Sequence, residues 1–147
     1  MINIKSLLLV EDNPQDEMLT LRALRKAKLA NRIDVVRDGQ QALDYLFKDG
    51  EFADREGPTL PTVVLLDISL PRLSGLEVLE RLRADTRTAL LPVVILTSSD
   101  EDRDRLKSYE IGANSFVRKP VNFAEFAETV ANLGVYWLAT NEPPPVR

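Results

Sequence analysis

Two residue types are absent from this chain of 147 residues: cysteine and histidine. Without cysteine, disulfides, thiolate zinc sites and cysteine nucleophiles are excluded. Without histidine, a Ser–His–Asp triad and imidazole base catalysis are excluded, and so is a histidine kinase or histidine phosphotransfer protein acting through its own residues. Any chemistry must therefore come from carboxylates, lysine, hydroxyl groups, backbone groups or a bound hard cation.

Long apolar runs and a basic surface are missing as well. No stretch approaches the ~20 apolar residues of a membrane span, and the N-terminal MINIKS lacks the apolar segment of a signal peptide. The net charge of −4 argues against a nucleic-acid-binding body, which needs a basic face to neutralise phosphates. We therefore expect a cytoplasmic protein that binds neither a membrane nor nucleic acid.

Short apolar runs alternate with helical patterns along the chain. The length fits one domain, and three of the runs are nearly continuous aliphatic stretches, typical of parallel strands covered on both faces. Five strand–helix units indicate an α/β fold, a doubly wound parallel sheet with helices on both faces. The predicted strands are Leu7–Val10, Ile33–Val36, Val63–Leu66, Val93–Leu96 and Ser115–Val117.

Helix starts are marked by residues that cap helices. Asn13 is followed by Pro14, a residue favoured at the first helical position. In three other places a Ser or Asn precedes a Glu by three residues, which is the spacing of a capping box. The predicted capping residues are Asn13, Asp38, Ser74, Ser98 and Asn122.

Two segments fall outside the strand–helix units. The stretch Asp49–Pro61 is polar with Gly and Pro, and we expect a long surface loop there. Residues 141–147 include Pro143–Pro145, which cannot continue a helix, and we expect a flexible tail. The predicted domain therefore spans residues 1–140 and ends in an extended helix.

Polar residues follow four of the predicted strands, at the end where open α/β sheets place their sites. Taken alone, each has an ordinary explanation as a loop acid, a helix cap, a strand residue or a surface charge. Together they are coherent, because crowded carboxylates need a cation and oxygen ligands favour Mg²⁺ or Mn²⁺ over zinc. A carboxylate can also accept a phosphoryl group. The residues are Glu11, Asp12, Asp67, Thr97 and Lys119.

With these residues in this order, the chain resembles the response-regulator receiver family from Lys5 to about Leu138. Thr97 lies 30 residues after Asp67, and Lys119 lies 52 residues after it, which fits the family. The resemblance implies a flavodoxin-like sheet with strand order 2-1-3-4-5. The matching segments are LLLVEDN (7–13), LLDISLPRLSG (65–75), ILTSS (95–99) and NSFVRKP (114–120).

The resemblance also implies roles for the acidic residues. It makes Asp67 the phosphoacceptor and a ligand of Mg²⁺ or Mn²⁺. Asp12 would bind the metal directly, Glu11 would act through a water, and the backbone carbonyl of Ser69 would be the third protein ligand. Glu11 departs from the more usual Asp and has a longer side chain.

Four further expectations come from the family. Thr97 would contact a phosphoryl oxygen and Lys119 would pair with the phosphoryl group. Phe116 occupies the position of an aromatic rotamer switch, and because it lacks a hydroxyl it would act by burial. The bond between Lys119 and Pro120 would be a cis peptide.

Within the family, the chain is most similar to small stand-alone regulators associated with bacterial and cyanobacterial phytochromes. The shared features are Glu11, the long loop before the third strand, NSFVRKPVNFAEF and a C-terminal YWL. The implied partner is a sensor histidine kinase, of phytochrome type by this narrower resemblance. We expect no output domain after the last predicted helix, and therefore signalling through protein contacts with no enzymatic turnover beyond slow hydrolysis of the aspartyl-phosphate.

The last predicted helix carries apolar residues on more than one face, whereas a soluble monomer needs one stripe. Phe123, Phe126, Val130, Leu133 and Trp137 lie on one face, with Val135 and Leu138 beyond it. The wider stripe predicts a homodimer through the fourth helix, the fifth strand, the fifth helix and the C-terminal region.

Three other functions would fit parts of the sequence. The sites of phosphatases that use an Asp nucleophile resemble a D-x-D pattern. The segment Asp67-Ile68-Ser69 lacks the second Asp of that pattern. A flavodoxin-like flavin or nucleotide binder needs anion-binding loops, whereas the first strand runs into acids. A receiver-like adaptor that works without phosphorylation stays open as the alternative.

Overall fold

The computed structural model describes residues 5–28, 32–56 and 60–145. Five parallel strands form one sheet in the order β2-β1-β3-β4-β5, so the predicted fold class and strand order are confirmed. Each predicted strand lies within one residue of an observed one. The strands are β1 (Ser6–Val10), β2 (Arg32–Val36), β3 (Val63–Leu66), β4 (Val93–Thr97) and β5 (Ser115–Arg118).

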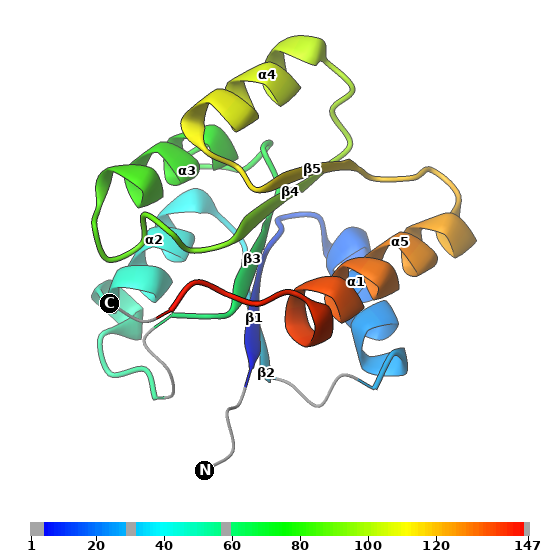
Figure 1. Cartoon of the computed structure of the whole chain (residues 1–147), viewed down its shortest axis with the longest axis horizontal. Helices are drawn as coiled ribbons and strands as arrows, with labels where there is room; N and C mark the ends of the chain where they lie inside the picture. The colour runs from blue at the N-terminus through cyan, green and yellow to red at the C-terminus, as the bar shows by residue number, and fades with distance from the viewer. Residues whose placement is uncertain (1–4, 29–31, 57–59, 146–147) are drawn as a thin grey trace.

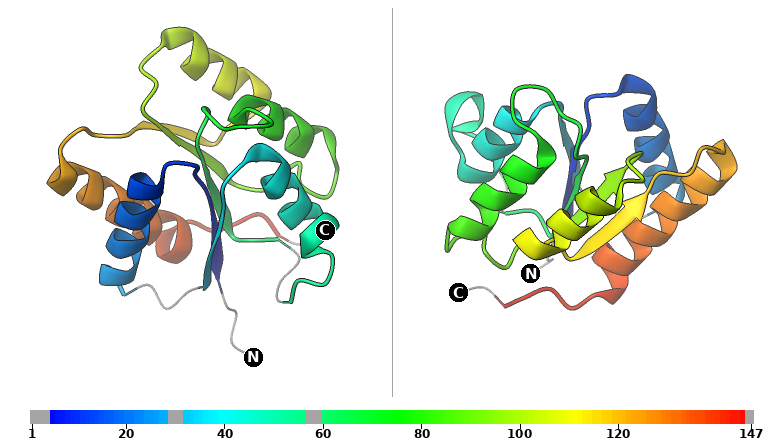
Figure 2. Two further views of the ribbon diagram at one scale, coloured as in Figure 1. Left: turned by 180° about the vertical axis from the view of Figure 1, so that it is seen from behind. Right: turned by 90° about the horizontal axis from the view of Figure 1, so that it is seen from above.

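Helices cover both faces of the sheet. Figure 1 shows α1 and α5 on one face and α2, α3 and α4 on the other, and the views of Figure 2 agree. None of the helices in the described ranges is both long and apolar enough to cross a bilayer. The helices are α1 (Pro14–Lys26), α2 (Gly39–Phe47), α3 (Gly75–Ala84), α4 (Asp102–Ile111) and α5 (Phe123–Val135), with a short 3₁₀ helix η1 (Gly50–Phe52) and a π-helical turn η2 (Tyr136–Thr140).

The core is divided by the sheet because successive side chains of a strand point to opposite faces. In β1, Leu8 and Val10 pack under α2 and α3, whereas Leu7 and Leu9 pack under α1 and α5. All five residues of β1 and all four of β3 are buried. The central strands are therefore held on both faces, and their carboxyl ends are fixed in position.

Four of the five predicted helix caps are confirmed. The side chains of Asn13, Asp38, Ser74 and Asn122 each accept hydrogen bonds from backbone N–H groups of the first helical turn. The Ser98 cap is wrong. Helix α4 begins later, at Asp102, after a residue that makes no side-chain cap bond.

Helix α4 is attached more weakly than the other helices. Ser108 is its buried residue, whereas Leu106 is 62% and Tyr109 is 50% exposed. Because few apolar groups leave water when this helix packs, we expect it to move more easily than α2 or α3.

The chain stays helical beyond α5 to Thr140, but as the π-helical turn η2. The wider π-helical turn of η2 shifts the side chains around the axis, and Leu138 is only 3% exposed in the core beneath α1 and α5. Leu138 is therefore not part of an outer apolar face, as the helical pattern suggested. Residues 141–145 form no helix or strand, and residues 146–147 of the predicted tail lie outside the described residues.

The predicted loop before β3 is partly ordered by contacts with α2. It contains η1, and the ring of Phe52 packs edge-on against Tyr45 with centroids 5.4 Å apart. The guanidinium of Arg55 lies 4.0 Å from the centre of the Tyr45 ring and donates to the Tyr45 carbonyl. Residues 57–59 of this loop lie outside the described residues.

Arg83 of α3 joins this helix to two later segments of the chain, and a substitution there tests how much these contacts stabilise the fold. Its guanidinium donates to the carbonyls of Gly112 (2.9 Å) and Thr88 (3.0 Å) and to the side chain of Asn114 (3.0 Å). We expect Arg83→Ala to lower the free energy of unfolding by about 2–3 kcal/mol, because partly buried acceptors lose charged donors. Urea denaturation measures this, with Arg81→Ala on the same helix as the control expected within about 0.5 kcal/mol of wild type. An Arg83→Ala variant as stable as that control would contradict the prediction.

Candidate functional site

The candidate site lies at the carboxyl ends of β1, β3 and β4, where β1 separates β2 from β3 and the strand order reverses. Backbone hydrogen bonds carry the chain past the strand ends. The N–H of Glu11 donates to Val36 (3.1 Å) and that of Asp67 to Val10 (3.2 Å). The N–H of Lys119 donates to Thr97 at 2.7 Å. These bonds bring residues from distant parts of the sequence to one edge of the sheet.

Three carboxylates meet at this edge. One oxygen from each of Glu11, Asp12 and Asp67 lies within 4.8 Å of the others. Glu11 and Asp67 are buried, at 2% and 6% exposure, whereas Asp12 is exposed. Carboxylate oxygens so close together fit a hard divalent cation that reaches the site from the Asp12 side. The donor set therefore suits Mg²⁺ or Mn²⁺.

Lys119 is buried beside this group and donates to three carboxylates. Its Nζ lies 2.6 Å from Glu11 Oε1, 2.8 Å from Asp67 Oδ2 and 2.9 Å from Asp16 Oδ2. An ammonium group has three N–H donors, so all of them are used. Glu11, Asp67 and Lys119 thus form a buried ionic cluster, which the partly exposed Asp16 joins through Lys119.

The Asp67 carboxylate is held on both oxygens. Oδ1 accepts a hydrogen bond from the Thr97 hydroxyl at 2.9 Å and from the Ser69 N–H at 3.1 Å, while Oδ2 accepts from Lys119. The Ser69 backbone therefore lies next to the carboxylate. These contacts fix the orientation of a group that would otherwise rotate about its side-chain bonds.

A glycine allows the chain after Asp67 to turn back closely. A Cβ atom on Gly75 would lie 2.1 Å from the Asp67 carbonyl oxygen, much closer than van der Waals contact. The Gly75 N–H also donates to the Ile68 carbonyl at 2.8 Å. Any larger residue at the start of α3 would displace the backbone that carries Asp67.

Phe116 lies on the face of β5 that packs against the cluster under α2 and α3, and it is half-buried. It pairs with Ile95 of β4, two residues before Thr97. The cis bond implied between Lys119 and Pro120 is wrong, because no cis peptide occurs in the described residues. The bond is trans, which is also the more stable isomer of most X–Pro bonds.

Burial by itself shifts the pKa values of Glu11 and Lys119 in opposite directions. Burial raises the pKa of Glu11 to about 7, although its hydrogen bond and ion pair with Lys119 lower it. Burial alone would lower the pKa of Lys119, but the carboxylates of Asp67 and Glu11 outweigh this effect and raise that pKa. Lys119 therefore stays charged, and Glu11 is the group of this pair that titrates near neutral pH.

Sequence reasoning missed two contacts of the site. No sequence pattern marks Asp16 as a partner of Lys119, to which its carboxylate is bound at 2.9 Å. Ser99 was not singled out, yet its N–H donates to the Thr97 hydroxyl (3.3 Å) and its hydroxyl to Asp104 of α4 (2.7 Å). The available signal for Asp16 was its place three residues after the Asn13 cap, in the first turn of α1.

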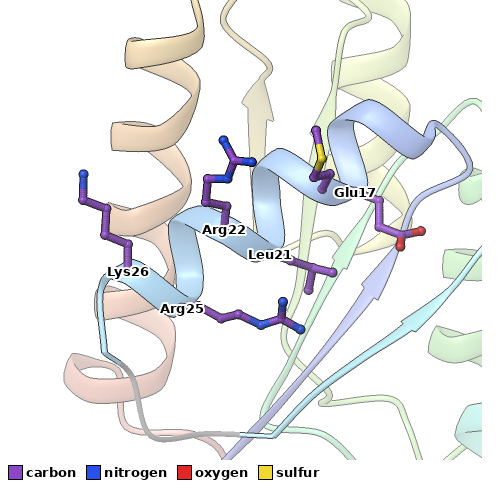
Figure 3. A pocket seen from close by; sticks show the side chains of 6 residues that line it. Glu17, Leu21, Arg22, Arg25 and Lys26 are labelled. Atoms are coloured by element: carbon purple, nitrogen blue, oxygen red, sulfur yellow. The ribbon is translucent and has the colours of Figure 1, made fainter.

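A separate hollow lies along α1. Figure 3 shows the labelled side chains along α1 in two rows, Arg22 and Lys26 on one side and Glu17, Leu21 and Arg25 on the other. Glu17 is bound by Arg37 through two hydrogen bonds. Because the polar groups of this hollow do not converge, we assign it no small ligand.

Comparison with known proteins gives one family. The model of the response regulator receiver domain matches residues 7–131. The probable methanogenesis regulatory protein FilR2 of Methanothrix harundinacea is 40% identical over 138 residues, which are 94% of this chain and 86% of FilR2.

Solved structures are similar over nearly the whole chain. The phosphorylated cyanobacterial phytochrome response regulator RcpA has a TM-score of 0.90 and 33% identity, covering 97% of this chain and 100% of RcpA. The Mn²⁺-bound form of response regulator Rcp1 has a TM-score of 0.89 and 32% identity, covering 96% and 99%. The bacteriophytochrome response regulator RtBRR is 52% identical with a TM-score of 0.76, covering 97% and 86%.

The raised pKa of Glu11 predicts a pH-dependent cation site. Below pH 7 Glu11 takes up a proton and the site loses a negative charge, so we expect Mg²⁺ affinity at pH 6 to be up to about tenfold weaker than at pH 8. Isothermal titration calorimetry between pH 6 and 8 measures this. The Glu11→Gln variant, which has no proton to lose there, should bind more weakly with a flatter pH dependence. Equal wild-type affinities at pH 6 and pH 8 would contradict the prediction.

Proposed function

The chain belongs to the response regulator receiver domain family, and on that premise we propose that it accepts a phosphoryl group on Asp67 from a sensor histidine kinase. The observation that carries the proposal is the Asp67 carboxylate, buried and fixed by Thr97, Ser69 and Lys119 beside two further acids. An oxygen of Asp67 would attack phosphorus as the bond to the donor nitrogen breaks. The donor imidazole leaves with the electron pair of that bond, and an aspartyl-phosphate remains.

A divalent cation, Mg²⁺ or Mn²⁺, belongs to this proposal. Glu11, Asp12, Asp67 and the backbone carbonyl of Ser69 are the residues that would hold it, with Glu11 acting through a water. The cation would neutralise charge on the phosphoryl oxygens. Support comes from the oxygen-only donor set of this chain and from the likeness to the Mn²⁺-bound form of Rcp1.

Thr97 and Lys119 are proposed to stabilise the product. The aspartyl-phosphate carries about −1.5 to −2 charges, more than the carboxylate it replaces. Lys119 supplies a positive charge within hydrogen-bonding distance of Asp67, and Thr97 supplies a hydroxyl on the opposite oxygen. Both groups already lie against the acceptor.

The conformational response is proposed to run through Thr97 and Phe116. The hydroxyl of Thr97 also accepts from Ser99, whose side chain donates to Asp104 in α4. A shift of Thr97 toward the phosphoryl group would therefore pull on the first turn of a weakly anchored helix. The side chain of Phe116, half-buried on β5, would then move into the space that Thr97 leaves. A few kcal/mol of differential contact suffice to shift such an equilibrium.

The proposed partner is a sensor histidine kinase of phytochrome type. Support comes from the likeness to a cyanobacterial phytochrome response regulator and to a bacteriophytochrome response regulator, over 97% of this chain in each case. We expect no turnover of an external substrate.

A second copy of the chain is the other proposed partner. Apolar side chains stay exposed on α4 and at the end of α5, although Leu138 is buried. A face of this kind fits an isologous dimer through α4, β5, α5 and the C-terminal region. The exposed residues are Leu106, Tyr109, Val135 and Tyr136.

The phosphoacceptor is tested by Asp67→Asn. Incubation with Mg²⁺ and acetyl phosphate should add one phosphoryl group to the wild-type chain and none to this variant, because an amide is not a nucleophile for phosphorus. Intact-protein mass spectrometry measures the added mass. Asp54→Asn, which changes an exposed aspartate after η1, is the control and should label as wild type does. Stoichiometric labelling of Asp67→Asn would refute the assignment.

The dimer is tested by Val135→Lys. Val135 is 44% exposed at the end of α5, and a charge there should separate the copies while leaving each one folded. Sedimentation velocity at low micromolar concentration should show a wild-type dimer and a monomeric variant. The control is Met18→Lys, which changes an apolar residue of α1 that is 51% exposed and lies outside the proposed interface. A monomeric wild type, with and without phosphorylation, would end the dimer proposal.

A further inference from the structure

Asp16 contacts the buried cluster from a different element than the other acids. It lies in the first turn of α1, where its backbone N–H donates to the Asn13 side chain at 3.0 Å. Its carboxylate accepts from Lys119 Nζ at 2.9 Å, although the two residues are 103 positions apart. The Asp16 side chain is 27% exposed, whereas that of Lys119 is 5% exposed. Asp16 therefore joins the mouth of the site to the buried ammonium group.

Among the acceptors of Lys119 in the described residues, Asp16 stands apart. Glu11 and Asp67 belong to the three acids whose oxygens gather within 4.8 Å, and Asp16 does not. Under the proposed function, Glu11 and Asp67 would change partners when a cation and a phosphoryl group bind. Asp16 would keep its charge and its contact with Lys119.

We propose that Asp16 is a positioning residue for Lys119, one that holds the ammonium toward α1 and competes with the phosphoryl group for it. The inference rests on the proposed function, because it assumes a phosphoryl group on Asp67. All three N–H donors of Lys119 are in use. The phosphoryl group would accept the Lys119 N–H that now donates to Asp67. A second N–H of Lys119 would still donate to Asp16.

Because of this competition, Asp16 should affect the binding of cations and the binding of anions in opposite directions. Without the negative charge of Asp16, the Lys119 ammonium would be less neutralised and would lie closer to Glu11 and Asp67. A less neutralised ammonium repels an incoming cation and attracts an anionic phosphoryl group. Removing Asp16 should therefore weaken Mg²⁺ binding and strengthen binding of a phosphoryl analogue, whereas a merely structural loss would weaken both.

The experiment compares wild type with Asp16→Ala and Asp16→Asn. Calorimetry gives the affinity for Mg²⁺ alone, and fluorine NMR gives the affinity for beryllofluoride, an analogue of the phosphoryl group, at saturating Mg²⁺. For Asp16→Ala we expect beryllofluoride to bind about three- to tenfold more tightly and Mg²⁺ about two- to fivefold more weakly, the range for one partly exposed charge-assisted bond. Asp16→Asn should lie between, because its amide oxygen still accepts from Lys119 without the charge.

The matched control is Glu17→Gln, which removes the neighbouring carboxylate of the same helical turn. Glu17 is bound by Arg37 and is not a partner of Lys119, so both affinities should equal those of wild type. Circular dichroism checks the fold, and Asp16→Asn serves as the test if Asp16→Ala does not fold.

Three outcomes would overturn the role of Asp16. In the first, the tested Asp16 variant shifts both affinities in the same direction. In the second, it leaves beryllofluoride affinity unchanged while wild type binds the analogue, which overturns this inference alone. In the third, wild type itself binds no beryllofluoride, which overturns the phosphoacceptor proposal together with this one.

Discussion

The burial of the Lys119 ammonium among carboxylates is the interaction on which the site depends. Taking charges out of water costs several kcal/mol for each ion, and the cost is offset only where partners and hydrogen bonds are complete. Here the three donors of Lys119 meet three carboxylate oxygens, and both oxygens of Asp67 are bound. The ends of β1, β3 and β5 and the first turn of α1 are thereby fixed to one another.

The same cluster explains why the site can respond to charge. Its acids outnumber its cation, so the isolated site is short of positive charge, and burial holds the pKa of Glu11 near 7. In the proposed function, a divalent cation would relieve the repulsion between the carboxylates and a phosphoryl group would restore it. Each binding event would then change the hydrogen-bond partners of Lys119 and Thr97.

The elements of the fold differ in how much apolar surface holds them in place. Strands β1 and β3 are buried along their whole length, and α3 is tied to the following segments through Arg83. Helix α4 has little apolar anchoring, yet the bonds from Thr97 through Ser99 to Asp104 reach its first turn. In the proposed function, a shift of Thr97 would therefore reach a helix with little apolar anchoring through two hydrogen bonds.

The sequence by itself determined the strands, four of the helix caps and the fold class, because these follow from local patterns: aliphatic runs, capping side chains and their alternation. It also marked Glu11, Asp12, Asp67, Thr97 and Lys119, since a parallel sheet brings the carboxyl ends of its strands to one edge. Only the tertiary structure decided the rest. The Asp16 contact, the inward turn of Leu138 and the late start of α4 at Asp102 depend on how separate elements pack, and no local pattern encodes the distance between them.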